Sequence, residues 1–138
     1  MPLRVYSRAQ DGAQRLSPHF RVREFACRDG SDPVFLEDEL VALLEAIRVH
    51  FGTAVTITSG FRTASYNARV PHASAHSQHL YGRAADFRVA GVSVEEAAAY
   101  AETLLRGKGG IGRYPPRSGR PYGWVHIDTR PGQARWNG

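Results

Sequence analysis

The stretch from Ser77 to Asp86 constrains the fold of this chain more than any other, because it holds an imidazole and a carboxylate seven positions apart around a glycine. Gly82 lets the chain turn tightly between His79 and Asp86, and the two alanines that follow are small enough for the turn to pack closely. Residues 86–89, which follow, are predicted to form a short strand. A turn that leads into a strand can direct both polar side chains at one point.

Neutral imidazole and ionised carboxylate are the usual nitrogen and oxygen ligands of zinc, but two donors do not make a metal site. The best candidate for a third donor is His126, in the segment Trp124–Asp128. Apolar and polar residues alternate there, which is typical of a half-buried strand. Three protein ligands leave a fourth tetrahedral position open for water, as in catalytic rather than structural zinc sites.

The pattern Ser-x-His-x-x-Gly-x-Ala-x-Asp, followed downstream by an aromatic-flanked histidine, resembles the signature of the zinc D-Ala-D-Ala carboxypeptidases. That family also includes phage L-alanyl-D-glutamate endopeptidases. The fixed positions of the pattern are filled by Ser77, His79, Gly82, Ala84 and Asp86. Upstream, residues 58–62 and the pair Tyr66-Asn67 are similar to the family's substrate-binding segment. The resemblance extends from about Ser17 to Trp136 and so covers nearly the whole chain.

The resemblance implies a peptidase that hydrolyses peptide bonds in peptidoglycan stem peptides with a metal-activated water. It implies one zinc ion (Zn2+) per chain, with His79, Asp86 and His126 as its ligands. Arg62 resembles the family's substrate-binding arginine. Such a guanidinium could hold a substrate carboxylate through paired hydrogen bonds. The alternative is that Arg62 forms a surface salt bridge. Ser77 either binds substrate or fixes the turn. Whether a terminal D-Ala is removed or an internal bond is cut stays open.

The general base is the point where the sequence departs from the family. Some members have a glutamate three residues before the last histidine, where Gly123 stands here, and others a histidine two before it, where Trp124 stands. Asp128 lies two residues after His126, so on a strand both side chains point to the same face. We expect Asp128 to be the catalytic base; the alternative is that it orients His126 from behind.

Composition narrows the remaining function classes. A single cysteine, Cys27, excludes an internal disulfide, and no apolar run is long enough to cross a membrane. The net charge of +5 comes from scattered arginines, which favours an anionic cell wall over nucleic acid as a partner. The N-terminus lacks the apolar core of a signal peptide, so we expect synthesis in the cytoplasm and action at the bacterial wall or periplasm, as for phage lysins. The competing hypothesis is a non-catalytic wall-binding or virion protein that keeps the fold and metal.

The order of elements predicts an α+β fold, with a small, mostly antiparallel sheet and helices packed against it. The resemblance implies the same hedgehog-like arrangement of the D-Ala-D-Ala peptidases. We expect a loosely ordered arm over residues 1–16 and a single, monomeric peptidase-like domain over 17–138. Helices are predicted for a short turn at 17–25 and for 34–51, 63–70 and 93–105, and strands for 54–58, 86–89, 110–114 and 124–129.

Overall fold

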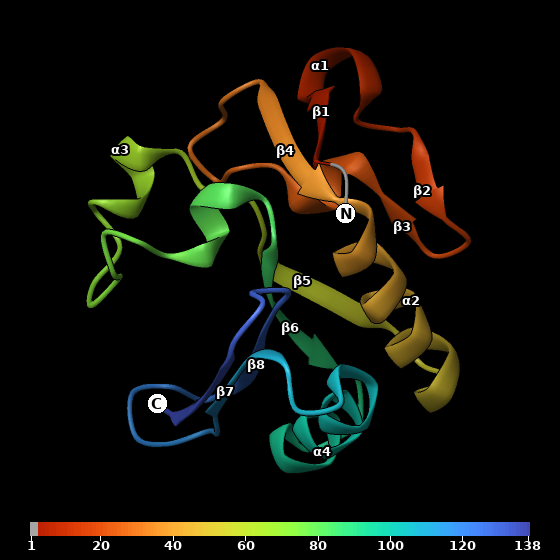
Figure 1. The fold of residues 1–138 in the computed structure, drawn as a ribbon, viewed down its shortest axis with the longest axis vertical. Helices are drawn as coiled ribbons and strands as arrows, with labels where there is room; N and C mark the ends of the chain where they lie inside the picture. Colours follow the sequence, from red (N-terminus) through yellow and green to blue (C-terminus); the bar gives the residue numbers. More distant parts are fainter. Residues whose placement is uncertain (1–2) are drawn as a thin grey trace.

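A five-stranded sheet carries the site, in a computed structural model that describes residues 3–138 (Figure 1). Its spatial order is β5-β6-β8-β7-β9, and neighbouring strands are antiparallel except for the parallel pair β7 and β9. The strands are β5 (Val55–Ser59), β6 (Ala84–Val89), β7 (Gly109–Tyr114), β8 (Trp124–Asp128) and β9 (Gln133–Asn137). The predicted α+β class with a mostly antiparallel sheet is confirmed.

The two long helices, α2 (Asp38–Phe51) and α4 (Val94–Leu105), contact each other and pack against the sheet. The buried apolar residues of β6 and β8 belong to this core, including Ala85, Phe87, Val125 and Ile127. Because side chains alternate along a strand, Asp86 and His126 point to the opposite face of the sheet. The helices thus leave one face of the central strands free for polar chemistry.

The N-terminal part differs from the loosely ordered arm that we expected over residues 1–16. Strand β1 (Leu3–Ser7) pairs antiparallel with β4 (Pro33–Glu37), and residues 1 and 2 lie outside the described part of the chain. The reason is non-local, because β1 obtains its backbone hydrogen bonds from a strand that follows it by about thirty residues. Between them lie α1 (Arg8–Asp11), β2 (Arg15–Ser17), β3 (Phe20–Arg21) and the 3-10 helix η1 (Val22–Phe25).

Two predicted helices begin later than expected for the same reason. The turn predicted from Ser17 starts at Val22, because Ser17 ends β2 and its hydroxyl donates to Glu45 instead of capping a helix. The helix predicted from Val34 starts at Asp38, since the preceding five residues form β4. Strand β9 was not predicted at all.

The remaining local predictions agree with the structure, except that the helix predicted for 63–70 already ends at Asn67. Thr63 caps the short helix α3 (Ala64–Asn67), and Ser93 caps α4 by accepting a hydrogen bond from the amide of Glu96. The turn of the central motif is the 3-10 helix η2 (Gln78–Tyr81), which ends at Gly82 with a positive φ of 70°. No helix among residues 3–138 is long and apolar enough to cross a membrane.

Candidate metal centre

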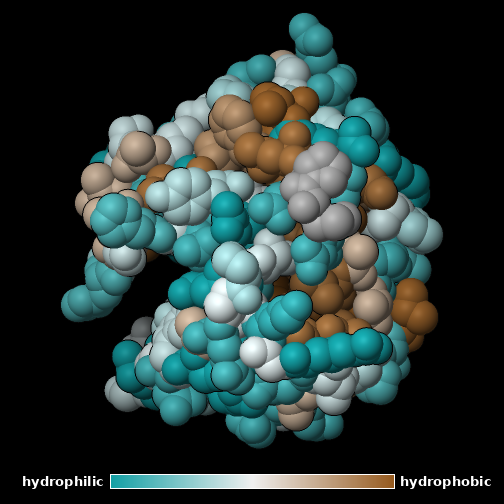
Figure 2. Space-filling model, in the orientation of Figure 1, coloured by the Kyte–Doolittle hydropathy of each residue, from teal (hydrophilic) through white to brown (hydrophobic). Residues whose placement is uncertain are grey.

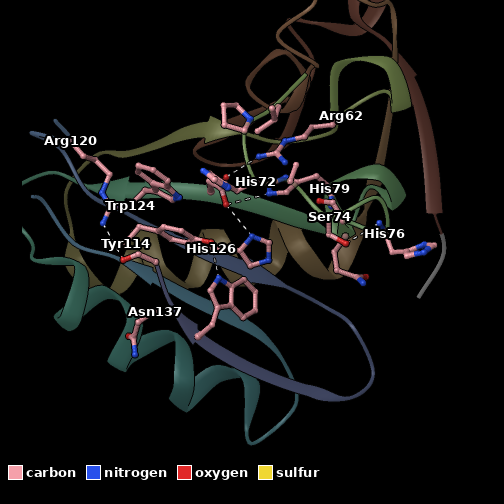
Figure 3. A pocket seen from close by; sticks show the side chains of 18 of the residues that line it. Arg62, His72, Ser74, His76, His79, Tyr114, Arg120, Trp124, His126 and Asn137 are labelled. Atoms are coloured by element: carbon pink, nitrogen blue, oxygen red, sulfur yellow. Dashed lines mark hydrogen bonds and ion pairs between the residues drawn. The ribbon is translucent and has the colours of Figure 1, made fainter. Parts of the chain in front are cut away.

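Three buried side chains meet on the face of the sheet that the helices leave free (Figure 3). Asp86 on β6 lies directly opposite His126 on β8, and His79 comes from the turn η2. The Nδ1 atom of His126 is 3.0 Å from Oδ1 of Asp86, and Nε2 of His79 is 3.3 Å from the same oxygen. One donor atom from each residue lies within 4.8 Å of the other two. The structure therefore brings the three predicted ligands together.

The spacing of these donor atoms fits a tetrahedral metal ion. Zinc ligands about 2.0–2.1 Å from the ion lie roughly 3.3–3.4 Å from one another in a tetrahedron. The observed separations of 3.0 and 3.3 Å are close to that value. Two imidazoles and one carboxylate are a donor set that suits zinc, although other divalent transition metals accept it.

The tautomer of His79 is fixed by the backbone of the neighbouring segment. Its Nδ1 atom lies 2.7 Å from the carbonyl oxygen of Gly60, which can only accept a hydrogen bond. Nδ1 therefore carries the proton, and the lone pair of Nε2 faces Asp86. Burial of the ring lowers the pKa of His79, which keeps the imidazole neutral and able to bind a metal.

His126 is held from behind by Asp128, on the side of the ring away from Asp86. Its Nε2 atom lies 2.7 Å from Oδ2 of Asp128, so Nε2–H donates to the carboxylate and Nδ1 faces the other ligands. The Asp128 side chain has no exposed surface and accepts two hydrogen bonds from the guanidinium of Arg130, at 2.8 and 2.7 Å. This geometry favours the alternative, in which Asp128 orients His126, over our expectation of a catalytic base.

The charges around His126 are mutually stabilising. Burial opposes the charged form of the ring, but hydrogen bonds with Asp128 and Asp86 outweigh it and hold the pKa of His126 above its ordinary value. For Asp128, burial is likewise outweighed by His126 and Arg130, so the pKa of this carboxyl is far below its usual range. Asp128 is thus an anion at neutral pH, a hydrogen-bond acceptor toward the ring.

Gly110 provides the space for the buried carboxylate of Asp128. The two residues are partners across β7 and β8. A Cβ atom at position 110 would lie well within 3.0 Å of the Asp128 carboxylate, closer than real Cβ atoms approach their neighbours. The absence of a side chain at this position is therefore part of how His126 is oriented.

Arg62 and Ser77 both line the cleft beside this cluster. The Arg62 guanidinium donates to Ser59, to Asn67 and to Oδ2 of Asp86, the last at 3.4 Å, and only 11% of its side chain is exposed. This ion pair lies in the site and is not the surface salt bridge of the alternative. The Ser77 hydroxyl accepts a hydrogen bond from the amide of His79 and so caps η2, as expected if it fixes the turn.

The cluster lies in a cleft of about 980 Å³. The segment 70–79 forms one wall, and residues from β7, the loop after it and β9 form the other. Figure 2 shows the corresponding notch, whose surroundings are largely hydrophilic. His76 lies in the exposed loop of the first wall, and no described hydrogen bond joins its ring to the cluster.

Trp136 is a site residue that the sequence did not reveal. The centre of its ring lies 4.9 Å from the ring centre of His126, and its Nε1 donates to the hydroxyl of Tyr114 at 2.7 Å. It reaches the site because β9 pairs in parallel with β7, with Trp136 opposite Gly112. The signal available in the sequence was the short alternating segment 133–137, which we did not interpret as a strand.

Two comparisons of the sequence with known proteins found matches. The sequence profile of the Peptidase M15 family matches residues 18–128. The chain is also 35% identical over 88 residues to the probable peptidoglycan L,D-endopeptidase MepK of Haemophilus influenzae, an alignment that covers 61% of this chain. The chain spans about 43% of the length of that relative.

Proposed function

Because this chain belongs to the Peptidase M15 family, whose members are metal-dependent peptidases, we propose that it is a zinc endopeptidase acting on peptidoglycan stem peptides. The observation that carries the proposal is the convergence of His79, Asp86 and His126, whose donor atoms all lie within 4.8 Å of one another. Both imidazoles have their second nitrogen engaged by a hydrogen-bond acceptor, Gly60 or Asp128. Such support orients the free lone pairs toward a shared ion.

The protein's part in the reaction is to position and to bind. When bound, zinc would lower the pKa of a water molecule and polarise the carbonyl of the scissile peptide bond. His79, Asp86 and His126 would hold the ion, while Asp128 acts as a positioning residue through His126. Arg62 still has N–H groups without a described partner, so we propose that it binds a carboxylate or carbonyl of the substrate beside Asp86.

The cleft supports cleavage of an internal bond. Its volume of about 980 Å³ and its lining by the segment 70–79 and the loop after β7 leave room for more than a terminal residue beside the cluster. The relative named as an L,D-endopeptidase points in the same direction. Removal of a terminal D-Ala is the second candidate, and it is favoured by the position of Arg62, whose guanidinium would suit a terminal carboxylate.

The site of action follows from the substrate. We propose that the protein acts at the bacterial cell wall or in the periplasm, where its net positive charge would favour the anionic wall. The non-enzymatic hypothesis, a wall-binding or virion protein, is supported by one observation: Gly123 occupies the position where some members of the family have a glutamate.

Metal analysis and digestion of purified peptidoglycan test the proposal together. We expect about one zinc ion per chain and new peptide termini that disappear on chelation and return when zinc is restored. Mass spectrometry of the released peptides separates the two bond classes, because an endopeptidase releases peptides and a carboxypeptidase releases free D-Ala. Bound zinc without any cleavage would favour the wall-binding hypothesis, and protein that binds no metal would contradict the site.

A further inference from the structure

The arginines that line the cleft fall into two groups. Arg62 is paired with Asp86, and Arg130 with Asp128. Arg117 and Arg120 line the wall formed by the loop after β7, and no Asp or Glu side chain in the described part of the chain lies within 4 Å of either guanidinium. Among the described residues, Asp86 is the one acidic side chain of the cleft lining. This end of the cleft therefore carries positive charge that no acidic side chain neutralises.

A tight turn fixes the two unpaired arginines next to each other. The amide of Arg117 donates to the carbonyl of Arg120 at 2.9 Å, and the reverse hydrogen bond measures 2.8 Å. Gly119, with a φ of 78°, makes the reversal possible. Residues that exchange both hydrogen bonds in an antiparallel bridge carry their side chains on the same side, with Cβ atoms roughly 5 Å apart.

The Arg120 guanidinium is further fixed by its surroundings. Its Nε and one terminal nitrogen donate to the carbonyl of Pro115, at 3.0 and 2.6 Å, and the same terminal nitrogen lies 3.4 Å from the backbone oxygen of Gly138. Its Cζ atom lies 5.1 Å from the ring centre of Trp124 and 5.6 Å from that of Tyr114, and these two rings are stacked. Figure 3 shows these rings between Arg120 and His126. The Arg117 side chain, by contrast, is exposed and has no described hydrogen bond.

We propose that the Arg117–Arg120 turn is a second binding subsite, which recognises a free carboxylate on the substrate chain away from the bond that is cleaved. The inference rests on the proposed function, because it assumes a peptide lying in the cleft. A preorganised guanidinium beside an exposed one without described hydrogen bonds offers several N–H donors to one carboxylate. Since stem peptides carry such a group on the D-glutamyl residue and another at the C-terminus, both are candidate ligands.

Binding of synthetic stem peptides tests the subsite directly. The probe is L-alanyl-γ-D-glutamyl-L-lysyl-D-alanine with both carboxyl groups free, with only the D-glutamyl carboxyl amidated, or with only the C-terminus amidated. Dissociation constants come from calorimetry under chelation, which stops turnover, and kcat/KM is measured with zinc. We expect one of the two amides to bind about tenfold more weakly than the free peptide, because it loses charge-assisted hydrogen bonds.

The variants identify the residues responsible. Arg117→Gln should reduce the preference for the free acid over its amide without changing stability. The double variant Arg117→Gln/Arg120→Gln should abolish this preference. Arg117→Lys keeps the charge and should retain much of the preference. Lys108→Gln removes the same charge from an exposed residue outside the cleft and should leave the preference intact. The preference of the wild type should also weaken at high salt.

The outcomes separate this inference from the proposed function. An acid-to-amide preference that is equal in the wild type and the double variant would overturn the subsite, even if both proteins cleave the peptides. A preference that depends on Arg117 and Arg120 in a protein that cleaves no peptide would support the subsite and contradict the endopeptidase. Thermal unfolding of each variant shows whether loss of the Arg120 bonds to Pro115 has disturbed the loop; in that case Arg117→Gln, which breaks no described bond, decides.

Discussion

At the scale of single residues, the contacts of the buried Asp128 carboxylate favour our proposal that it positions His126. It contacts His126 from the side opposite Asp86, and Arg130 occupies its remaining acceptor positions. A base must reach the proton that it removes, whereas a positioning residue acts through the ligand that it holds. The two roles therefore predict different effects on metal affinity.

Replacing Asp128 with Asn should weaken metal binding. The amide still fits the space but loses its charge, and we expect the affinity for zinc to fall by about 10–100-fold, as for other groups that support a metal ligand. Competition with a chromophoric chelator measures this, and Asp38→Asn, at an exposed ion pair with Arg4, is the control. If Asp128→Asn keeps its metal affinity but loses kcat, the result would favour Asp128 as the catalytic base.

Adding a methyl group at Gly110 should disturb the same carboxylate from the neighbouring strand. The new Cβ would overlap the Asp128 side chain, so Gly110→Ala should lower the free energy of unfolding by about 1–3 kcal/mol and weaken metal binding as well. Urea denaturation and chelator competition measure the two effects. Gly132→Ala is a matched control, because a Cβ there meets nothing within 4 Å. Equal behaviour of the two variants would show that Asp128 has room to move.

At the scale of elements, Glu45 on helix α2 connects this helix to the hairpin formed by β2 and β3. Its carboxylate accepts hydrogen bonds from the Ser17 hydroxyl at 2.6 Å and from the amide of His19 at 2.9 Å, and it lies 2.6 Å from Nδ1 of His19. Burial alone would raise the pKa of Glu45, but these hydrogen bonds outweigh it and hold the pKa below its ordinary value of 4.5.

This depressed pKa fixes the direction of the pH dependence. A carboxyl whose folded-state pKa is lowered contributes stability above its unfolded-state pKa and loses that contribution as the pH falls through the folded-state value. Glu45→Gln should therefore be about 1–2 kcal/mol less stable than the wild type at neutral pH, and the difference should narrow in acid below about pH 4.5. Denaturation at a series of pH values tests this, with exposed Glu39→Gln as the control. A difference that does not change with pH would contradict the assignment.

The elements also show what can be predicted from sequence. The turn that presents His79, the caps at Thr63 and Ser93 and most of α2 follow from patterns within a few residues, and these predictions hold. Strands β1, β4 and β9 depend on partners far along the chain, and no local pattern names the partner. Trp136 was missed because β9 was missed.

The proposed ligands could be predicted from a local pattern, whereas the residues that support them depend on long-range strand pairing. Residue types and spacing predict His79, Asp86 and His126 as ligands, because the chemistry of a metal site selects few side chains, and the structure brings these three together. The placement of Asp128 behind His126 depends on which ring nitrogen faces which strand, and on the space left by Gly110. Such information arises from strand register and is not contained in a local pattern.

At the scale of the whole molecule, the metal centre links segments that are distant in sequence. Its proposed ligands come from η2, β6 and β8, so a bound ion would hold these elements together. Binding to the folded state alone stabilises it, by about 4 kcal/mol when free metal exceeds the dissociation constant a thousandfold. The melting temperature of the wild type should therefore rise with zinc and fall on chelation.

Calorimetry of the protein with and without zinc measures this shift. His79→Ala should remove the response to zinc, since two ligands hold the ion poorly, while Lys108→Gln should keep it. Equal melting temperatures for the wild type with and without zinc would argue against metal binding at this centre.

The parallel pairing of β9 with β7 sets a limit for anyone who recombines this domain with others. The match to the family profile ends at residue 128, just after the last proposed ligand, and would be a natural place to join a heterologous partner. A chimera cut there would keep the three ligands but lose the outermost strand of the sheet and the indole that lies against His126. The smallest transplantable unit should therefore extend through Asn137, where β9 ends.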